Sequence, residues 1–416
     1  MRRINSQVMR TFNIMQIVQT VQRHAPISRT ALTEKMGLTA ASVTNLTNGL
    51  LEAGILCQVG HDSNGSLGRK AMMLDVRSDA FYTLGMEMNN NCIVIGLANF
   101  RGDIIDSEDT PFDEHWEVDA AIDRVVELAG GILRRSGIPR ERLLGMGLAL
   151  PGPLDSKAGV MRNPPNMLKW KNVPICDILQ QRLGIPVCCD RETNAAALAE
   201  SICGASAGYE TSFMLSLFTM GIGGGFVSDG RVLRGFRDGA GEIGHTTVQT
   251  GGAHCVCGSY GCLETVVSER AIVSRVQQLW KLHPRSELPQ DPDTLTLKQV
   301  FLLCDRGEPV CRQVVEEAAT YVGIALRNVI NTISPQIIVL AGPMVSMSTA
   351  LVEKIQDYIR KSTYPHHGTD ITVCPTAWGE MAFVKGGIML AMDVFLEGAI
   401  SRHLKCLPAE RASLVI

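Results

Sequence analysis

The densest group of metal-binding side chains in the chain occupies one short stretch. His245, Cys255, Cys257 and Cys262 lie within 18 residues of one another. Zn²⁺ prefers a tetrahedral shell of thiolates and imidazoles, and a shell of three cysteines and one histidine leaves no position open for water. The stretch therefore predicts a structural zinc site, in which a loop of the folded chain closes around one ion. Two alternatives remain open: His254 as the fourth ligand, although it directly precedes Cys255, and a group of free reduced thiols.

Size and composition predict several domains. At 416 residues the chain exceeds an ordinary domain of roughly 100–200 residues. It has no apolar run of the roughly 20 residues that span a bilayer, and residues 1–11 lack the apolar core of a signal peptide. Thirteen cysteines, an odd number, argue against a disulfide framework. We expect a cytoplasmic protein that is not embedded in a membrane.

Residues 1–77 have the pattern of a small helical domain followed by a hairpin. Apolar residues recur at helical spacing from about residue 5 to 22, and this pattern places Phe12 on the apolar face of the first helix. Beyond Pro26, the hydroxyl of Ser28 is placed to cap a second helix that runs through Met36, and Thr39 is placed to cap a third.

The third helix and the hairpin have the features of a DNA-binding surface. The outer face of the helix is small, neutral and free of acids, so it can enter a major groove without repelling phosphates. Residues 60–68 form a Gly/Asn/Ser-rich tip between two apolar strands, which is typical of a wing. We expect DNA contacts from Ala40, Ala41, Thr44, Asn45 and Asn48 in the major groove and from Arg69 in the minor groove.

The charge balance supports this prediction. Residues 1–80 hold nine Lys/Arg and five Asp/Glu, whereas the remaining residues hold seven more acids than bases. A basic head on an acidic body suggests an anionic partner for the head alone. The pattern therefore predicts a winged helix-turn-helix that binds operator DNA. A helical adaptor that binds another protein is the alternative.

Beyond about residue 78 the pattern is that of an α/β body. Strand-like segments at 82–88, 92–97, 144–150 and 212–217 alternate with helical segments, and such alternation predicts a sheet covered by helices. A glycine cluster at 221–225 follows one of these strands, where backbone N–H groups could approach a phosphate. The segment after Gly386 is apolar and helical.

Three motifs give the chain a resemblance to the ROK family, which is named for repressors, open reading frames and kinases. They are Gly-Glu-Ile-Gly-His at 241–245, Cys-Val-Cys-Gly-Ser-Tyr-Gly-Cys-Leu-Glu at 255–264 and Asn-Ala-Ala-Ala-Leu-Ala-Glu at 194–200. The resemblance covers essentially the whole chain, and the head resembles the repressor branch of the family.

The resemblance implies a two-lobed, actin-like (ribonuclease H-like) sugar kinase fold, with zinc on the four residues named above, and symmetric homodimers or homotetramers. The expected domains are the winged head at 1–77 and a first lobe at 78–200, onto which a C-terminal helix at 381–416 packs back. A second lobe at 201–380 carries the zinc motif and the oligomerisation surface.

The resemblance also implies a sugar site between the lobes. Asn166, Glu242, His245 and Glu264 match the residues that bind sugar hydroxyls in the family. Their chemistry is suitable, because carboxylates and amides form paired hydrogen bonds with vicinal hydroxyls, and a zinc-bound imidazole keeps one nitrogen free. Support of the zinc loop is the alternative role for the two glutamates.

Arg191 stands where the kinase pattern has an uncharged Asn. Its guanidinium could pair with the phosphate or carboxylate of an acidic or phosphorylated sugar effector. The alternative is that Arg191 pairs with a neighbouring acid of the protein itself.

Three departures from the kinase pattern predict that phosphoryl transfer is lost. Glu-Met-Asn-Asn-Asn at 87–91 replaces Asp-Xaa-Gly-Xaa-Thr, and Thr-Met-Gly at 219–221 replaces Gly-Thr-Gly. Glu192 replaces the Asp that acts as the base, and it reaches one methylene further, although it remains a candidate effector contact. Phosphoryl transfer depends on positioning and charge neutralisation, so these changes argue against an enzyme.

These observations predict a repressor of carbohydrate-metabolism genes. Two heads of one oligomer would bind a palindromic operator, and a sugar or sugar phosphate in the cleft would change the spacing of the heads. The resemblance implies that ligand releases DNA, and release through a membrane transporter protein stays open. The alternatives are an ATP-dependent sugar kinase with a DNA-binding head and a zinc-sensing regulator, although a closed four-ligand site argues against sensing.

Overall fold

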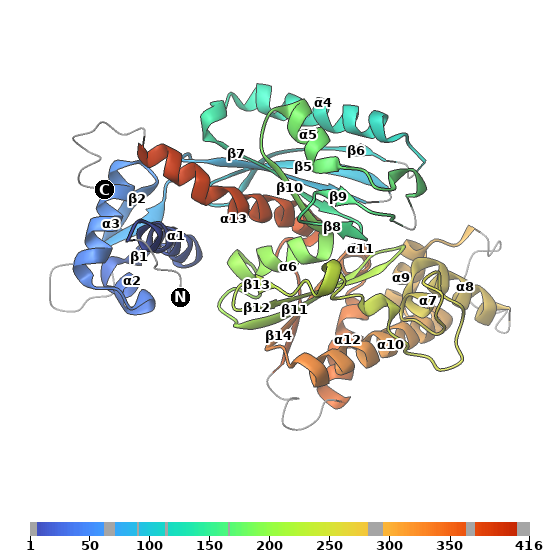
Figure 1. The fold of residues 1–416 in the computed structure, drawn as a ribbon. Helices are drawn as coiled ribbons and strands as arrows, with labels where there is room; N and C mark the ends of the chain where they lie inside the picture. Colours follow the sequence, from blue (N-terminus) through green and yellow to red (C-terminus); the bar gives the residue numbers. More distant parts are fainter. Residues whose placement is uncertain are drawn as a thin grey trace.

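The structure is a computed structural model, and it describes residues 6–61, 71–89, 91–112, 115–164, 167–281, 294–362 and 371–405. Figure 1 shows a small head at one end of the molecule and two α/β lobes beside it, with the long helix α13 running from the lobes to the head. Within these ranges no helix combines the length and the apolar character needed to cross a bilayer. This is the mixed α/β architecture that the sequence predicts.

The head consists of three helices and a three-stranded sheet. Ser28 accepts a hydrogen bond from the N–H of Ala31 (3.1 Å), and Thr39 accepts one from the N–H of Ser42 (3.2 Å), so both predicted N-caps are confirmed. The sheet has the order β1-β3-β2, and all its pairs are antiparallel. The elements are α1 (Ser6–His24), β1 (Ile27–Ser28), α2 (Arg29–Met36), α3 (Ala40–Glu52), β2 (Leu56–His61) and β3 (Met72–Val76).

One expectation for the first helix is wrong. Phe12 is 57% exposed, whereas Ile14, Ile17, Val18 and Val21 are buried. The buried residues follow the i, i+3, i+4, i+7 spacing of a single helix face, and Phe12 lies off that face because each residue turns the helix by about 100°.

The first lobe is built on a five-stranded mixed sheet of order β10-β7-β4-β5-β6. Strands β4, β5 and β6 form an antiparallel meander, and β7 and β10 continue from β4 in parallel. The elements are β4 (Tyr82–Met88), β5 (Cys92–Asn99), β6 (Ile104–Pro111), α4 (Val118–Ser136), β7 (Leu143–Leu150), α5 (Ile175–Leu183), β10 (Val187–Arg191) and α6 (Glu192–Cys203), with a small β8 (Leu154–Asp155) and β9 (Val160–Met161) pair.

The second lobe repeats this topology. Its sheet has the order β13-β12-β11-β14-β15, in which β11, β12 and β13 are antiparallel and β14 and β15 follow in parallel. Two sheets with the same order make the two-lobed, actin-like architecture. The elements are β11 (Thr211–Leu217), β12 (Ile222–Ser228), β13 (Arg231–Val232), α7 (Glu264–Val267), α8 (Glu269–Trp280), α9 (Leu297–Asp305), α10 (Pro309–Ile333), β14 (Ile337–Ala341), α11 (Pro343–Met347), α12 (Thr349–Ser362) and β15 (Thr372–Pro375).

Helix α13 (Ala382–Lys405) crosses α6 and the first sheet at very short range. A Cβ atom on Gly147 of β7 would lie 2.0 Å from the carbonyl oxygen of Gly387, and one on Gly386 would lie 2.6 Å from the backbone nitrogen of Ala196 in α6. These glycines are therefore required, because the backbones touch where side chains would otherwise stand.

The other end of α13 completes the core of the head. Leu396, Ala399 and Ile400 are buried in one cluster with Ile17 of α1 and Leu50 of α3. His403 of α13 also forms a 2.9 Å hydrogen bond with the carbonyl oxygen of Ala53. One rigid element thus contacts the head, the first sheet and α6 (Figure 1).

Candidate functional site

The predicted metal ligands come together at the edge of the cleft. The ligand atoms of His245, Cys255, Cys257 and Cys262 all lie within 4.8 Å of one another. The distance from His245 Nδ1 to Cys255 Sγ is 3.5 Å, and that from Cys257 Sγ to Cys262 Sγ is 3.7 Å. A tetrahedral zinc ion with Zn–S bonds of about 2.3 Å and a Zn–N bond of about 2.0 Å would place its ligands about 3.5–3.8 Å apart.

The donor set and spacing therefore fit one tetrahedral ion. His254, the rival ligand, is not in this group among the described residues, and its ring instead packs edge-on against Tyr260. The loop closes through the 2.8 Å hydrogen bond from Cys255 N–H to Ser259 O. It also needs Gly261, where a Cβ would lie 1.8 Å from the carbonyl oxygen of Gln249.

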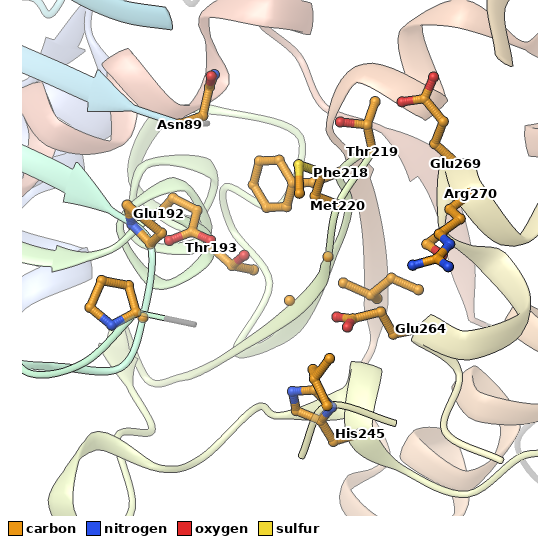
Figure 2. A pocket seen from close by; sticks show the side chains of 18 of the residues that line it. Asn89, Glu192, Thr193, Phe218, Thr219, Met220, His245, Glu264, Glu269 and Arg270 are labelled. Atoms are coloured by element: carbon orange, nitrogen blue, oxygen red, sulfur yellow. The ribbon is translucent and has the colours of Figure 1, made fainter. Parts of the chain in front are cut away.

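The metal-ligand group borders a large cavity between the lobes, with a volume of about 1020 Å³. Because Nδ1 of His245 faces the thiol group, Nε2 is the nitrogen that remains for a ligand in the cavity. Glu264 begins α7 two residues after Cys262, and Figure 2 shows its carboxylate and the His245 ring close to each other on one side of the cavity. A Cβ on Gly221 would lie 3.6 Å from Glu264 Oε2, so the turn between β11 and β12 approaches this carboxylate closely.

Arg191 is held by protein groups on the other lobe. Its Nη1 lies 2.7 Å from Glu242 Oε1, and its Nη2 donates to the carbonyl oxygen of Ala240. The side chain of Arg191 is 9% exposed, and that of Glu242 is 49% exposed. The arrangement matches the alternative that the sequence left open, in which Arg191 pairs with a neighbouring acid.

A second ion pair lies beside the first and also joins the lobes. Arg234, which follows β13, donates to the buried carboxylate of Asp190 at the end of β10. Burial raises the pKa of Asp190, and the charge and hydrogen bond of Arg234 oppose that rise. Asp238 accepts hydrogen bonds from the N–H (3.0 Å) and hydroxyl (2.9 Å) of Ser156 at the same junction. These polar contacts, which we call the interlobe clamp, tie the two lobes together on one side of the cavity.

Glu192 begins α6, directly after Arg191 of the clamp, and lines the cavity beside Thr193 (Figure 2). Its Oε2 is buried and has no hydrogen-bond partner among the described residues, and the same is true of Thr193 Oγ1. Burial raises the pKa of Glu192 to about 8, and the charges of Glu87 and Glu242 add to the rise, whereas Arg191 opposes it.

Replacing Glu192 by glutamine should stabilise the protein in a pH-dependent way. From about pH 4.5 to 8 the folded protein keeps a proton that the unfolded chain has lost, so the free energy of unfolding of the native protein falls across this window. The variant has no such proton. The free energy of unfolding of the variant should exceed that of the native protein by almost nothing below pH 4.5. The difference should grow to the order of a few kcal/mol above pH 8.

Urea unfolding of both proteins at several pH values measures this difference, with the exposed Glu210→Gln variant as a control. A constant difference between Glu192→Gln and the native protein at every pH would contradict the expectation.

The kinase pattern has two phosphate-binding turns, and the first of them corresponds to the turn after β4 in this chain. A side chain of the turn itself, Asn89, closes it. Asn89 Oδ1 accepts hydrogen bonds of 2.9 Å from the N–H groups of Asn91 and Cys92, and its Nδ2 donates to Glu87 Oε1 (3.0 Å). Burial raises the pKa of Glu87 to about 7. Two backbone donors that could approach a phosphate are thus already used by an asparagine whose role the sequence did not reveal.

The second turn presents a methionine. Phe218 N–H donates to Gly221 O (3.0 Å) and closes the turn between β11 and β12, and Met220 stands at its tip, 44% exposed and lining the cavity. The carbonyl oxygen of Thr219 accepts a 3.0 Å hydrogen bond from the N–H of Glu269 at the start of α8.

The predicted DNA-contact face of α3 lies on the surface of the head. The structure adds Arg29 of α2, which donates to Thr47 Oγ1 (2.9 Å) and to Asn48 Oδ1 (2.8 Å), so the amide of Asn48 is held in one orientation. Two predicted contacts, Arg69 in the wing and Asn166 in the sugar site, lie outside the described residues. The remaining predicted residues, Ala40, Ala41, Thr44, Asn45 and Asn48, are all exposed.

Comparisons with known proteins agree on one family. The model of the ROK family matches residues 84–394. The Caldicellulosiruptor bescii xylose repressor is 28% identical over 394 residues, which cover 94% of this chain and 98% of the repressor.

Solved structures include relatives of two kinds. A ROK family transcriptional regulator, a homologue of the Escherichia coli MLC protein, superposes with a TM-score of 0.79 at 26% identity, covering 95% of this chain and 99% of the other. A ROK family glucokinase from Streptomyces griseus, solved with glucose and AMPPNP, gives a TM-score of 0.65 at 25% identity, covering 75% of this chain and 99% of the glucokinase.

Proposed function

Because this chain belongs to the ROK family, whose model spans most of its length, we propose that it is a sugar-responsive transcriptional repressor. The observation that carries the proposal is the union of two parts in one chain. The head exposes an acid-free helix face on α3, which packs beside β2, and the body holds a cavity lined by acidic side chains. The near full-length similarity to a xylose repressor and to a ROK transcriptional regulator supports the same role.

The sugar would lie against Glu242, His245 and Glu264, with Arg191 and Glu192 nearby and Asn166 as a further contact. Carboxylates accept hydrogen bonds from hydroxyl groups, and the nitrogen of His245 that faces away from the thiols can take part in one more. Arg191 would position Glu242 rather than bind an anion, because its guanidinium already contacts Glu242 and Ala240.

Zinc would act as a structural ion on His245, Cys255, Cys257 and Cys262. When bound, it would supply a rigid centre that fixes the loop carrying His245 and Glu264. The chain's own groups would do the rest: thiolates hold the loop, and carboxylates bind hydroxyls.

The sugar signal would reach the head through α6 and α13. Glu192 at the start of α6 lines the cavity, α6 packs against α13, and α13 ends in the core of the head. A ligand that draws Glu242 towards its hydroxyls would alter the interlobe clamp and favour one lobe arrangement. Only a ligand that binds the two arrangements unequally can shift their populations.

We place the protein in the cytoplasm, as a homodimer or homotetramer whose paired heads bind a palindromic operator. The working division is a head at 1–77, a first lobe at 78–200 with 381–416, and a second lobe at 201–380. Control through a transporter protein is a further mode of release within this proposal.

The proposal predicts that a sugar will release the protein from DNA. Duplexes that the purified protein selects from a random pool provide operator DNA, and fluorescence anisotropy then follows release across a panel of neutral sugars and sugar phosphates. We expect a neutral sugar to weaken DNA binding by about 5- to 150-fold. Failure to select any sequence, or operator affinity that no sugar in the panel changes, would contradict the proposal.

The glucokinase similarity makes ATP-dependent sugar phosphorylation the second candidate. Asn89 occupies backbone donors of the first turn, Met220 stands at the second, and Glu192 replaces the shorter Asp. We therefore expect no ADP formation above background with glucose, xylose or any sugar that releases DNA. A coupled ADP assay measures it, and steady turnover with one of these sugars would favour the kinase.

A further inference from the structure

We propose that the cavity takes a neutral disaccharide, with the second sugar ring in the half of the cavity that lies away from His245. This inference rests on the proposed function, because it assumes that a first ring binds beside His245 and Glu264. To this second subsite, which we call the distal subsite, we assign six residues of the cavity lining: Phe218, Met220, Ser268, Arg270, Ser274 and Met347. Figure 2 shows Phe218, Met220, Thr219 and Glu269 farther from His245 than Glu264 is, with Arg270 between Glu269 and Glu264.

The first argument is size. Pockets that enclose drug-sized ligands have volumes of roughly 300–1,000 Å³. The cavity of this chain has a volume of about 1020 Å³, at the upper end of that range. One pyranose ring is much smaller than a drug-sized ligand, so a monosaccharide beside His245 would leave the distal subsite filled only with water.

The second argument is the chemistry of the lining. A sugar ring has an apolar face of C–H groups and a rim of hydroxyls. The distal subsite offers apolar surface from Phe218, Met220 and Met347, and hydroxyl or guanidinium groups from Ser268, Ser274 and Arg270. Phe218 is held in place by Phe383, with ring centroids 4.8 Å apart, and methionine adapts to irregular surfaces. Such a mixture suits a sugar ring.

The third argument is charge. Five acidic side chains line the cavity, those of Glu87, Glu192, Glu242, Glu264 and Glu269, against two guanidinium groups among the described residues. One of these, Arg191, is already paired with Glu242. The raised pKa of Glu192 keeps a proton on this side chain at neutral pH. With Arg191 and Glu242 paired, Glu264 and Glu269 still outnumber Arg270. The described lining therefore has no excess of positive charge to neutralise a phosphate, and it favours a neutral ligand.

The test compares matched sugars by isothermal titration calorimetry on the full-length protein: glucose with cellobiose, and xylose with xylobiose. We expect one disaccharide to bind roughly tenfold more tightly than its monosaccharide. Ala271 lines the cavity from α8, and Ala271→Phe should fill the distal subsite. This variant should remove the extra affinity for the disaccharide and leave the affinity for the monosaccharide unchanged. Gln278→Phe, on the exposed face of the same helix, is the matched control and should keep the extra affinity.

Met220→Ala offers a second test in case Ala271→Phe unfolds, because Met220 is exposed at the tip of its turn. It should reduce the ratio of disaccharide affinity to monosaccharide affinity several-fold. Equal affinities for monosaccharide and disaccharide, or tighter sugar binding with ATP than with a second ring, would overturn the distal subsite alone. If neither monosaccharides nor disaccharides bind, the sugar-responsive function fails with it.

Discussion

Replacing Cys262 by serine should empty the metal site and abolish sugar binding. We expect the zinc content to fall from about one ion per chain to nearly none, because a serine hydroxyl does not ionise to form a ligand as a thiolate does. Sugar affinity should fall by about a hundredfold or more. Inductively coupled plasma mass spectrometry measures the metal, and calorimetry measures the sugar.

The effect should be large because the metal site and the cavity share a backbone. Cys262 is fully buried, its carbonyl oxygen accepts the 3.0 Å hydrogen bond of Thr265 N–H, and Glu264 lies between the two. His245 belongs to both the metal-ligand group and the cavity lining. Losing the ion would therefore release the cavity groups from their positions as well as the loop.

Cys203→Ser is the control, since Cys203 is exposed and lies outside the metal-ligand group. It should keep its zinc, its melting temperature and its sugar affinity. A Cys262→Ser protein that retained stoichiometric zinc and normal sugar binding would show that the four residues do not form the structural site.

Placing an acid on α3 should abolish operator binding. Asn45 is exposed on the face that bears no acid, and Asn45→Asp puts a carboxylate against DNA phosphates and removes an amide donor. An oligomer that uses two heads carries the change twice. We expect operator affinity to fall by about a hundredfold or more at fixed salt, as measured by fluorescence anisotropy.

Gln278→Glu adds the same charge on the exposed face of α8 in the second lobe, and it should leave DNA binding nearly unchanged. Sugar binding should persist in both variants, which separates a damaged interface from an unfolded protein. If Asn45→Asp bound operator as tightly as Gln278→Glu, α3 would not be the recognition helix.

Features that depend on local sequence were predictable. The caps at Ser28 and Thr39 need only a hydroxyl followed by a helical segment. The strand at Tyr82–Met88 needs only a short apolar run. The metal-ligand group was visible because three of its four members follow one another within a single loop.

Contacts between residues that are far apart in the sequence were not predictable from it. The interlobe clamp joins Arg234 to Asp190 and Arg191 to Glu242, which are 44 and 51 residues apart. No pattern along the chain pairs such charges. The sequence favoured His245 over His254, and the folded loop brings the ring of His245 to the three thiols. By contrast, the turn that Asn89 closes is local, and its Asn-rich sequence was a signal that could have been used.

The course of α13 means that the head is not a detachable module. The first and last helices of the described chain share one buried cluster, so a fragment ending near residue 77 would lose Leu396, Ala399 and Ile400 from the apolar core that also contains Ile17 and Leu50. Transplanting this head onto another protein would require the last helix as well. A head and its closing helix therefore form one folding unit that the chain assembles from its two ends.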